Sequence, residues 1–210
     1  RGAAGPAGRL GAAQDYGLGG LQRPYTLTAS ATAFFALAAA SSGSNLLTVG
    51  NANLLLVHGT PAQQAGFAGN EFSGRWTGTM CLSEPQAGSS LSDIVTRAEP
   101  QEDGTYRITG NKMWISAGEH ELSENIVHLV LAKVPGPDGK LIPGVKGISL
   151  FIVPKKLVNA DGSLGDRNDG VLAGLNHQLG YRGNTNVLPH FRQGKSRPQC
   201  HPAPTVIPFR

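Results

Sequence analysis

The pattern of hydrophobic and polar positions divides the chain near residue 75. Residues 24–70 contain no charged side chain, so this stretch lacks the polar face of an ordinary surface helix. Alanine-rich and apolar runs predict helices over 28–40 and 46–57, and Pro61 predicts the first turn of a third helix that extends to residue 72. We expect these helices to be buried on several sides, either by their own domain or by a partner.

After residue 74 the pattern changes to short runs rich in β-branched and aromatic residues. They predict strands over 76–82, 106–109, 113–116, 126–134, 148–153, 170–179 and 186–191. Turn-forming sequences such as Glu102-Asp103-Gly104 separate them, and strands at this spacing are typical of a sandwich or barrel. The predicted fold class is α+β, with a partial helical domain over 1–75 and a β domain over 76–191.

Charge and composition narrow the function classes. The chain carries 18 basic and 14 acidic residues, and the excess lies in a proline-rich tail over 192–210, which we expect to be poorly ordered. The balanced remainder argues against a nucleic-acid partner. Two cysteines in no metal-binding spacing fit a reducing, cytoplasmic compartment. No signal peptide is visible, and the apolar run 31–40 is too short to span a bilayer.

The segment MCLSEPQAGSSL, residues 80–91, places small polar groups where an apolar strand ends. Pro85 fixes the backbone there, and Gly88 permits a close or unusual path. Hydroxyls and exposed N–H groups at such a strand end can hold an anion or the edge of a planar ring. An ordinary surface loop has the same residue types. A second strand, KMWIS at 112–116, also ends in a hydroxyl residue, so the two ends could line one pocket.

Together these two segments resemble motifs of the acyl-CoA dehydrogenase family. The first is similar to the family's flavin-binding signature, and the second to its Lys-x-Trp-Ile-Thr/Ser-x-Gly motif. NIVHLVLAK at 125–133, GISLFIVPK at 147–155 and HQLGYRGNTNVLPHF at 177–191 follow in the expected order. The sequence TGTMCL at 77–82 resembles the corresponding segment of the family's 3-methylmercaptopropionyl-CoA dehydrogenase branch. Ordered motifs of this length are far more specific than a lone glycine pattern.

The resemblance implies site residues, each with a plainer alternative role. Met80 and Leu82 would pack against flavin or simply belong to the core, and Ser83 would bond the flavin edge. The other implied cofactor contacts are Gly88, Ser89, Trp114 and Ser116. Ser89 and Arg182 would contact the substrate, although Arg182 could equally be a solvated surface residue. Glu84 is expected to have a structural role.

The resemblance also implies a reaction, the α,β-dehydrogenation of an acyl-CoA with hydride transfer to FAD. An electron-transfer flavoprotein would accept the electrons, and full-length members would form homo-oligomers. The family's catalytic glutamate lies in a C-terminal four-helix bundle that this sequence lacks, so we assign no catalytic residue and no metal ligand. We therefore expect a catalytically incomplete fragment. The alternatives are a non-catalytic β-barrel binding module and a DNA-associated flavoprotein relative.

Overall fold

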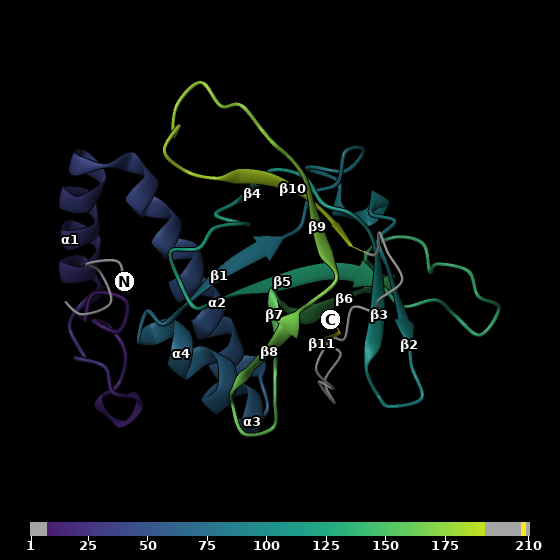
Figure 1. The fold of residues 1–210 in the computed structure, drawn as a ribbon, viewed down its shortest axis with the longest axis horizontal. Coiled ribbons are helices and arrows are strands. Elements are labelled where there is room, and N and C mark those ends of the chain that lie inside the picture. Colours follow the sequence, from purple (N-terminus) through teal and green to yellow (C-terminus); the bar gives the residue numbers. More distant parts are fainter. Residues whose placement is uncertain (1–7, 192–206, 209–210) are drawn as a thin grey trace.

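A computed structural model describes residues 8–191 and 207–208 of this chain, which folds into a helical part and a curved sheet (Figure 1). The helices are α1 (Tyr25–Ala38), α2 (Asn45–His58), α3 (Pro61–Gln63) and α4 (Gly69–Phe72). A π-helical segment, Gln64–Ala68, joins α3 to α4. The three predicted helices are therefore confirmed, and the third continues from Pro61 to Phe72 as expected.

The strands form one nine-stranded mixed sheet and a separate two-stranded pair. Their bounds are β1 (Trp76–Cys81), β2 (Arg97–Pro100), β3 (Tyr106–Asn111), β4 (Ile115–Ser116), β5 (Asn125–Lys133), β6 (Ile148–Pro154), β7 (Lys156–Val158), β8 (Leu164–Arg167), β9 (Gly170–Leu175), β10 (Asn186–Phe191) and β11 (Ile207–Pro208). The main path runs β11-β6-β5-β2-β3-β10-β4, with β1 beside β5 and β9 beside β10, and β7 pairs with β8. The sheet is an open half-barrel in the described chain, and the α+β class is confirmed.

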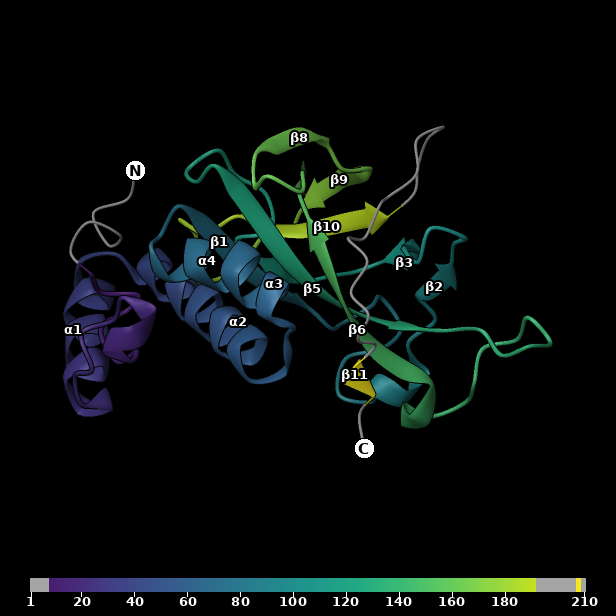
Figure 2. The same cartoon turned by 90° about the horizontal axis from the view of Figure 1, so that it is seen from below.

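Strand β5 lies at the centre of the fold and is buried along its whole length. It pairs in parallel with β1 and antiparallel with β6. Its side chains alternate between two cores: Leu129 packs in the cluster that includes α2 and α4, and Val130 packs in the cluster that includes β10. This period-2 alternation is the geometry of a strand covered on both faces. Figure 2 shows α2 and β10 on opposite sides of β5.

Polar residues in α2 attach that helix to the sheet. Asn51 donates from Nδ2 to the carbonyl of Val127 at 2.9 Å, and Thr48 accepts from the backbone N–H of Gly78 at 3.0 Å. A Cβ atom on Gly78 would lie 2.4 Å from both Asn51 and Glu71. Glycine at this position therefore allows β1 to approach the helices closely. The hydrogen bond that Asn51 donates to β5 explains why an apolar helix contains a buried asparagine.

The expectation that the helices of residues 24–70 are buried on several sides is wrong for α1 within the described chain, and α2 is buried along one face only. No residue of α1 is buried, and Phe34 and Leu37 are largely exposed. Helix α1 lies at one end of the molecule, beyond α2 and away from the central strands (Figures 1 and 2). Freedom from charge predicts a need for burial, but only the contacts of the tertiary structure show whether burial occurs.

Three short strands of the β domain were not predicted, and two predicted strands are shorter than expected. The strand predicted over 113–116 covers only Ile115–Ser116. The missed strands, β2, β7 and β8, contain charged residues, and β2 also ends in proline. Backbone pairing with β3 places Ala98 of β2 in the core despite this composition. The strand predicted over 170–179 ends at Leu175. The disorder predicted for the tail lies outside the described residues, apart from the short strand β11.

Replacing Thr60 with alanine should lower the free energy of unfolding by about 1 kcal/mol. Thr60 caps α3, because its hydroxyl accepts from the N–H of Gln63 at 3.3 Å while Gln63 Oε1 accepts from the N–H of Thr60 at 2.8 Å. Urea denaturation would measure the change. The control is Thr26→Ala, because Thr26 is an exposed residue of α1. This substitution should change the free energy of unfolding by only a few tenths of a kcal/mol. Equal effects of the two substitutions would contradict the capping role.

Candidate functional site

The two motifs found in the sequence meet at the end of β1. The N–H of Met113 donates to the carbonyl of Ser83 at 3.0 Å, and Lys112 Nζ donates to the carbonyl of Leu82 at 3.0 Å. Residues about 30 positions apart are therefore hydrogen-bonded neighbours. The two strand ends therefore lie together, and the pocket that they could line stays a prediction.

A buried ion pair holds this junction. Glu84 Oε1 lies 2.8 Å from Lys112 Nζ, and both side chains are almost completely shielded from water. The same carboxylate accepts from the hydroxyl and N–H of Thr96 and from the N–H of Val95. Burial alone would raise the pKa of Glu84, but the hydrogen bonds from Lys112, Thr96 and Val95 hold it below its ordinary value. Glu84 is thus fully occupied, which fits the structural role expected for it.

Trp114 presents its ring to solvent at this junction. Its backbone φ is +63°, and 53% of the residue is exposed. A bulky residue in the left-handed region is strained, and such strain persists only where surrounding contacts impose it, often at ligand sites. The Met113–Ser83 hydrogen bond and the pairing of Ile115 with Val187 flank this position. An exposed aromatic face held in this way can stack on a planar ligand.

The other expected cofactor contacts differ in exposure. Met80 and Leu82 are half-buried against the core on the helix side, so part of each side chain serves packing. Ser83 is half-buried at the junction, whereas Gly88 and Ser89 are exposed. Ser83, Gly88 and Ser89 belong to the loop that follows β1, so one side of the junction carries small polar groups.

Two details bear on whether a flavin fits these residues. Gly88 has a negative φ, and a Cβ atom added to it would have no atom within 4 Å. The described fold therefore does not itself require glycine at this position, whereas a ligand that approaches the backbone closely would require it. Ser116 Oγ accepts from Asn186 Nδ2 at 3.4 Å, which leaves the hydroxyl hydrogen of Ser116 free to donate. The residues present are therefore compatible with a flavin and its pyrophosphate.

Arg182 is placed differently from the other predicted residues. It is exposed in the loop between β9 and β10, where its Nε donates to the carbonyl of Leu179 at 3.2 Å. Its neighbour Gly183 approaches Ser41 of the helical part. No described hydrogen bond joins Arg182 to the junction of the two motifs, so its substrate role remains a proposal.

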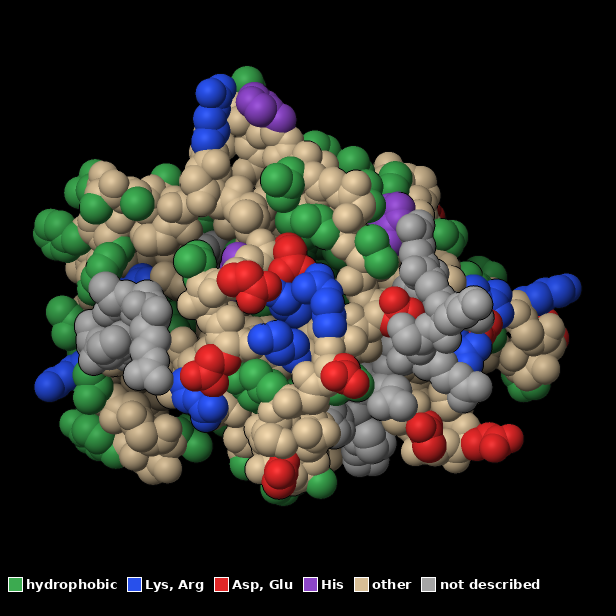
Figure 3. All heavy atoms as spheres, in the orientation of Figure 1, with side chains coloured by type: hydrophobic (Ala, Val, Ile, Leu, Met, Phe, Trp, Pro, Cys, Tyr) green, Lys and Arg blue, Asp and Glu red, His purple; other side chains and the backbone are tan. Residues whose placement is uncertain are grey.

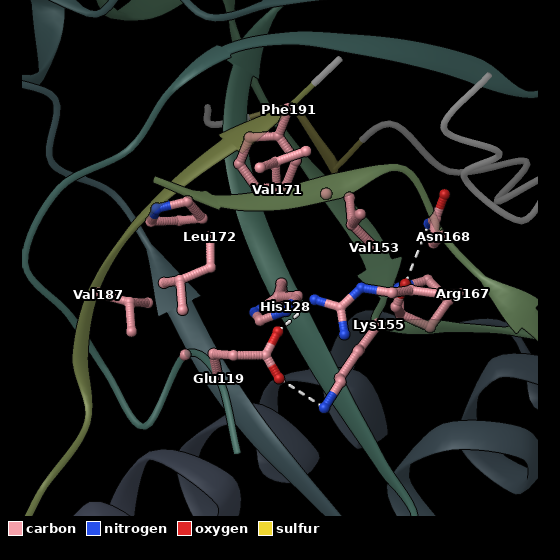
Figure 4. A pocket seen from close by; sticks show the side chains of 14 residues that line it. Glu119, His128, Val153, Lys155, Arg167, Asn168, Val171, Leu172, Val187 and Phe191 are labelled. Atoms are coloured by element: carbon pink, nitrogen blue, oxygen red, sulfur yellow. Dashed lines mark hydrogen bonds and ion pairs between the residues drawn. The ribbon is translucent and has the colours of Figure 1, made fainter. Parts of the chain in front are cut away.

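A charged cluster beside His128 was missed by sequence reasoning. Figure 4 shows Glu119 between Arg167 and Lys155, with ion pairs to both, and Lys155 also pairs with Glu121 at 2.6 Å. These residues come from four segments, and no motif signalled their proximity. Figure 3 shows acidic and basic side chains intermixed near the middle of one face, whereas hydrophobic side chains gather at the helical end.

The cavity at this cluster is too small for a cofactor. Its volume is about 30 Å³, which suits an ordered water molecule. His128 Nδ1 lies 2.7 Å from Thr79 Oγ1, and burial lowers the pKa of the ring to about 4, so it is neutral at pH 7. Among the described residues, no group of three or more His, Cys, Asp or Glu could hold a metal ion.

Comparisons with known proteins agree with the fold and motifs. The sequence profile "Acyl-CoA dehydrogenase, middle domain" matches residues 79–191. The chain is 45% identical over 175 residues to 3-methylmercaptopropionyl-CoA dehydrogenase of Ruegeria pomeroyi, covering 82% of this chain and 29% of that protein. It is 40% identical over 146 residues to a butyryl-CoA dehydrogenase of Syntrophomonas wolfei, covering 69% and 23%. The chain thus spans less than a third of these curated relatives.

Solved structures show the same fold. Butyryl-CoA dehydrogenase from Megasphaera elsdenii superposes with a TM-score of 0.70 at 23% identity, covering 93% of this chain and 46% of that one. An acyl-CoA dehydrogenase from Bacillus anthracis, complexed with FAD, gives 0.70 at 22% identity, covering 94% and 30%. None of the described helices has the length and apolar character that crossing a membrane requires.

Proposed function

Because this chain belongs to the acyl-CoA dehydrogenase family, we propose that it forms the flavin-binding and acyl-CoA-binding part of an FAD-dependent dehydrogenase. The observation that supports this proposal most directly is the hydrogen bond from Met113 to Ser83, which brings the two family motifs side by side. The proposed flavin face consists of the expected cofactor contacts Met80, Leu82, Ser83, Gly88, Ser89, Trp114 and Ser116. The whole protein would oxidise an acyl-CoA thioester between its α and β carbons. Identity to the Ruegeria pomeroyi enzyme favours a short sulfur-containing or linear acyl group.

Each residue of the face has a defined task in this proposal. Bound FAD supplies a hydride acceptor. Trp114 covers one side of the ring, and the hydroxyls of Ser83 and Ser116 donate to its polar edge. Gly88 and Ser89 admit the pyrophosphate, and Ser89 with Arg182 contacts the acyl-CoA. Small donors held by a rigid junction position a cofactor without needing to reorganise when it binds.

A base must also remove the α-proton of the substrate. Glu84 cannot do so, because its carboxylate is buried against Lys112 and Thr96. We propose that the base belongs to a part of the full-length protein not represented among the described residues. The remaining elements of the proposal follow the family: an electron-transfer flavoprotein as acceptor, a homo-oligomer as the full-length form, and a cytoplasmic location.

Replacing Trp114 with alanine should weaken FAD binding about tenfold, because stacking of a planar ring on an aromatic side chain contributes about 1–3 kcal/mol. Titration of the purified chain with FAD, followed by flavin fluorescence, would measure the dissociation constant. The control Tyr25→Ala removes an exposed aromatic side chain from α1 and should leave FAD binding unchanged. Failure of the unsubstituted chain to bind FAD would refute the proposed cofactor role.

The second candidate function is a flavin-binding module without turnover. It is favoured by the full occupation of Glu84, whose carboxylate is paired with Lys112 and is not available as a base. Neither candidate predicts turnover by the described residues alone, because neither has a base among them. Reduction of a dye acceptor in the presence of butyryl-CoA is therefore measured on the full-length protein. Turnover there would exclude the second candidate, whereas FAD binding without turnover would support it.

A further inference from the structure

A cavity of about 340 Å³ lies between the helical part and the β domain. Arg9 and Phe35 line it from the helical side, and Ala117, His120 and Asn184 line it from the β domain. Its volume is within the range of small-molecule sites. Ala117 follows the second motif, but none of the proposed flavin contacts lines this cavity.

Arg9 is a buried cation without a counter-ion in this cavity. Only 7% of the residue is exposed, and its Nε and Nη2 have no hydrogen-bond partner among the described residues. The guanidinium carbon lies 4.5 Å from the centroid of the Phe35 ring, which holds the planar group in place. Burying a charge and its N–H donors without partners is costly. An anion in the cavity would remove that cost.

The lining offers no acidic side chain to fill this role among the described residues. The other titratable group of the lining is His120, and burial, together with the charge of Lys155, lowers its pKa. The nearby carboxylates Glu119 and Glu121 are already paired with Lys155. The positive charge of Arg9 is therefore uncompensated within its surroundings.

Further unpartnered polar groups lie around the same cavity. Ser42 Oγ and Asn184 Nδ2 are buried and lack hydrogen-bond partners within the described part of the chain, and they come from opposite sides of the space. Leu10 and Phe35 supply apolar surface beside Arg9. The lining thus combines a planar cation, two neutral polar groups and an apolar wall.

We propose that this cavity binds a small molecule that carries one carboxylate on a short apolar body. The guanidinium of Arg9 would bind the carboxylate through the two parallel N–H donors Nε and Nη2. Inorganic phosphate could accept the same donors, but it has no apolar body to fill the rest of the cavity. Ser42 and Asn184 would complete the hydrogen bonding, and Leu10 and Phe35 would contact the apolar body. This site is independent of the proposed flavin face.

The test titrates the full chain with sodium hexanoate by isothermal calorimetry, alongside neutral hexanamide and inorganic phosphate. Hexanoate should bind, and hexanamide and phosphate should bind at least about tenfold more weakly. Arg9→Met keeps the apolar volume but removes the donors, so it should weaken hexanoate binding at least about tenfold. The matched control Arg23→Met removes an exposed arginine and should bind hexanoate as the unsubstituted chain does.

An NMR spectrum of the arginine Nε–H groups provides a readout that does not depend on the folding of any variant. Addition of hexanoate to the unsubstituted chain should shift one such signal, while hexanamide should leave it in place. Equal binding of hexanoate and hexanamide, unchanged binding by Arg9→Met, or a preference for phosphate would each overturn the proposal.

Discussion

Replacing Lys112 with methionine should lower the free energy of unfolding by about 3–5 kcal/mol, the range for removing one partner of a buried ion pair. The substitution leaves the carboxylate of Glu84 buried without its cation, and the carbonyl of Leu82 without its donor. Methionine matches the volume of the lysine stem, so the loss reports the charge and not a cavity. Urea denaturation at pH 7 would measure it.

The control for this prediction is an exposed ion pair in the same β domain. Arg75 and Glu124 lie 2.8 Å apart, but their side chains are 58% and 42% exposed. Arg75→Met should change the free energy of unfolding by less than about 1 kcal/mol, because water screens such pairs. A loss below about 1 kcal/mol for Lys112→Met would show that the buried pair does not anchor the junction.

Replacing Glu71 with leucine should raise the free energy of unfolding at pH 7 by about 1–3 kcal/mol, the cost of burying a polar group without partners. Glu71 is fully buried at the interface of α4 with β1, and neither carboxylate oxygen has a hydrogen-bond partner. Phe67, Phe72 and Leu55 belong to the surrounding core cluster. A leucine of similar volume would contribute packing in place of an unsatisfied acid.

The pH dependence of this gain has a definite sign. Burial raises the pKa of Glu71 well above its ordinary value. A carboxyl whose pKa is raised in the folded state disfavours folding once the unfolded chain ionises. The gain from Glu71→Leu should therefore be smallest below about pH 4, where the acid is protonated in both states, and should grow as pH rises toward the folded-state pKa.

Unfolding curves of both proteins across pH 4–8 would reveal this trend. The exposed substitution Glu124→Leu serves as the control, because it removes an acid of the same type from the surface. It should give no comparable stabilisation. A Glu71→Leu protein that is less stable than the unsubstituted chain at pH 7 would indicate that Glu71 has a partner that compensates its burial.

Much of the helical part could be predicted from the sequence because its signals are local. Pro61 opens its helix with Thr60 as the cap, and both features act within a few residues. The identity of the long buried strands is also local, since a run that is apolar from Ile126 to Ala132 except for His128 predicts β5. Strand β2 could not be predicted, because its stability comes from pairing with β3 and not from its own residues.

The candidate site divides in the same way. The order and sequence of the motifs around Ser83 and Trp114 identified the family, and they predict the group that the strand ends would hold. They could not show the left-handed backbone of Trp114, the exposed position of Arg182 or the cluster around Glu119. Each of these depends on residues from separate segments meeting in space.

The sequence by itself determined the fold class, the family and the neighbouring motifs of the site, because these follow from hydrophobic periodicity and from ordered local patterns. Only the tertiary structure decided which polar residues are buried. Glu84 and Lys112 neutralise each other, whereas Glu71 and Arg9 are left without partners. Each of these two pairs consists of one acid and one base, and their energies differ because burial and partnership are properties of three-dimensional contacts.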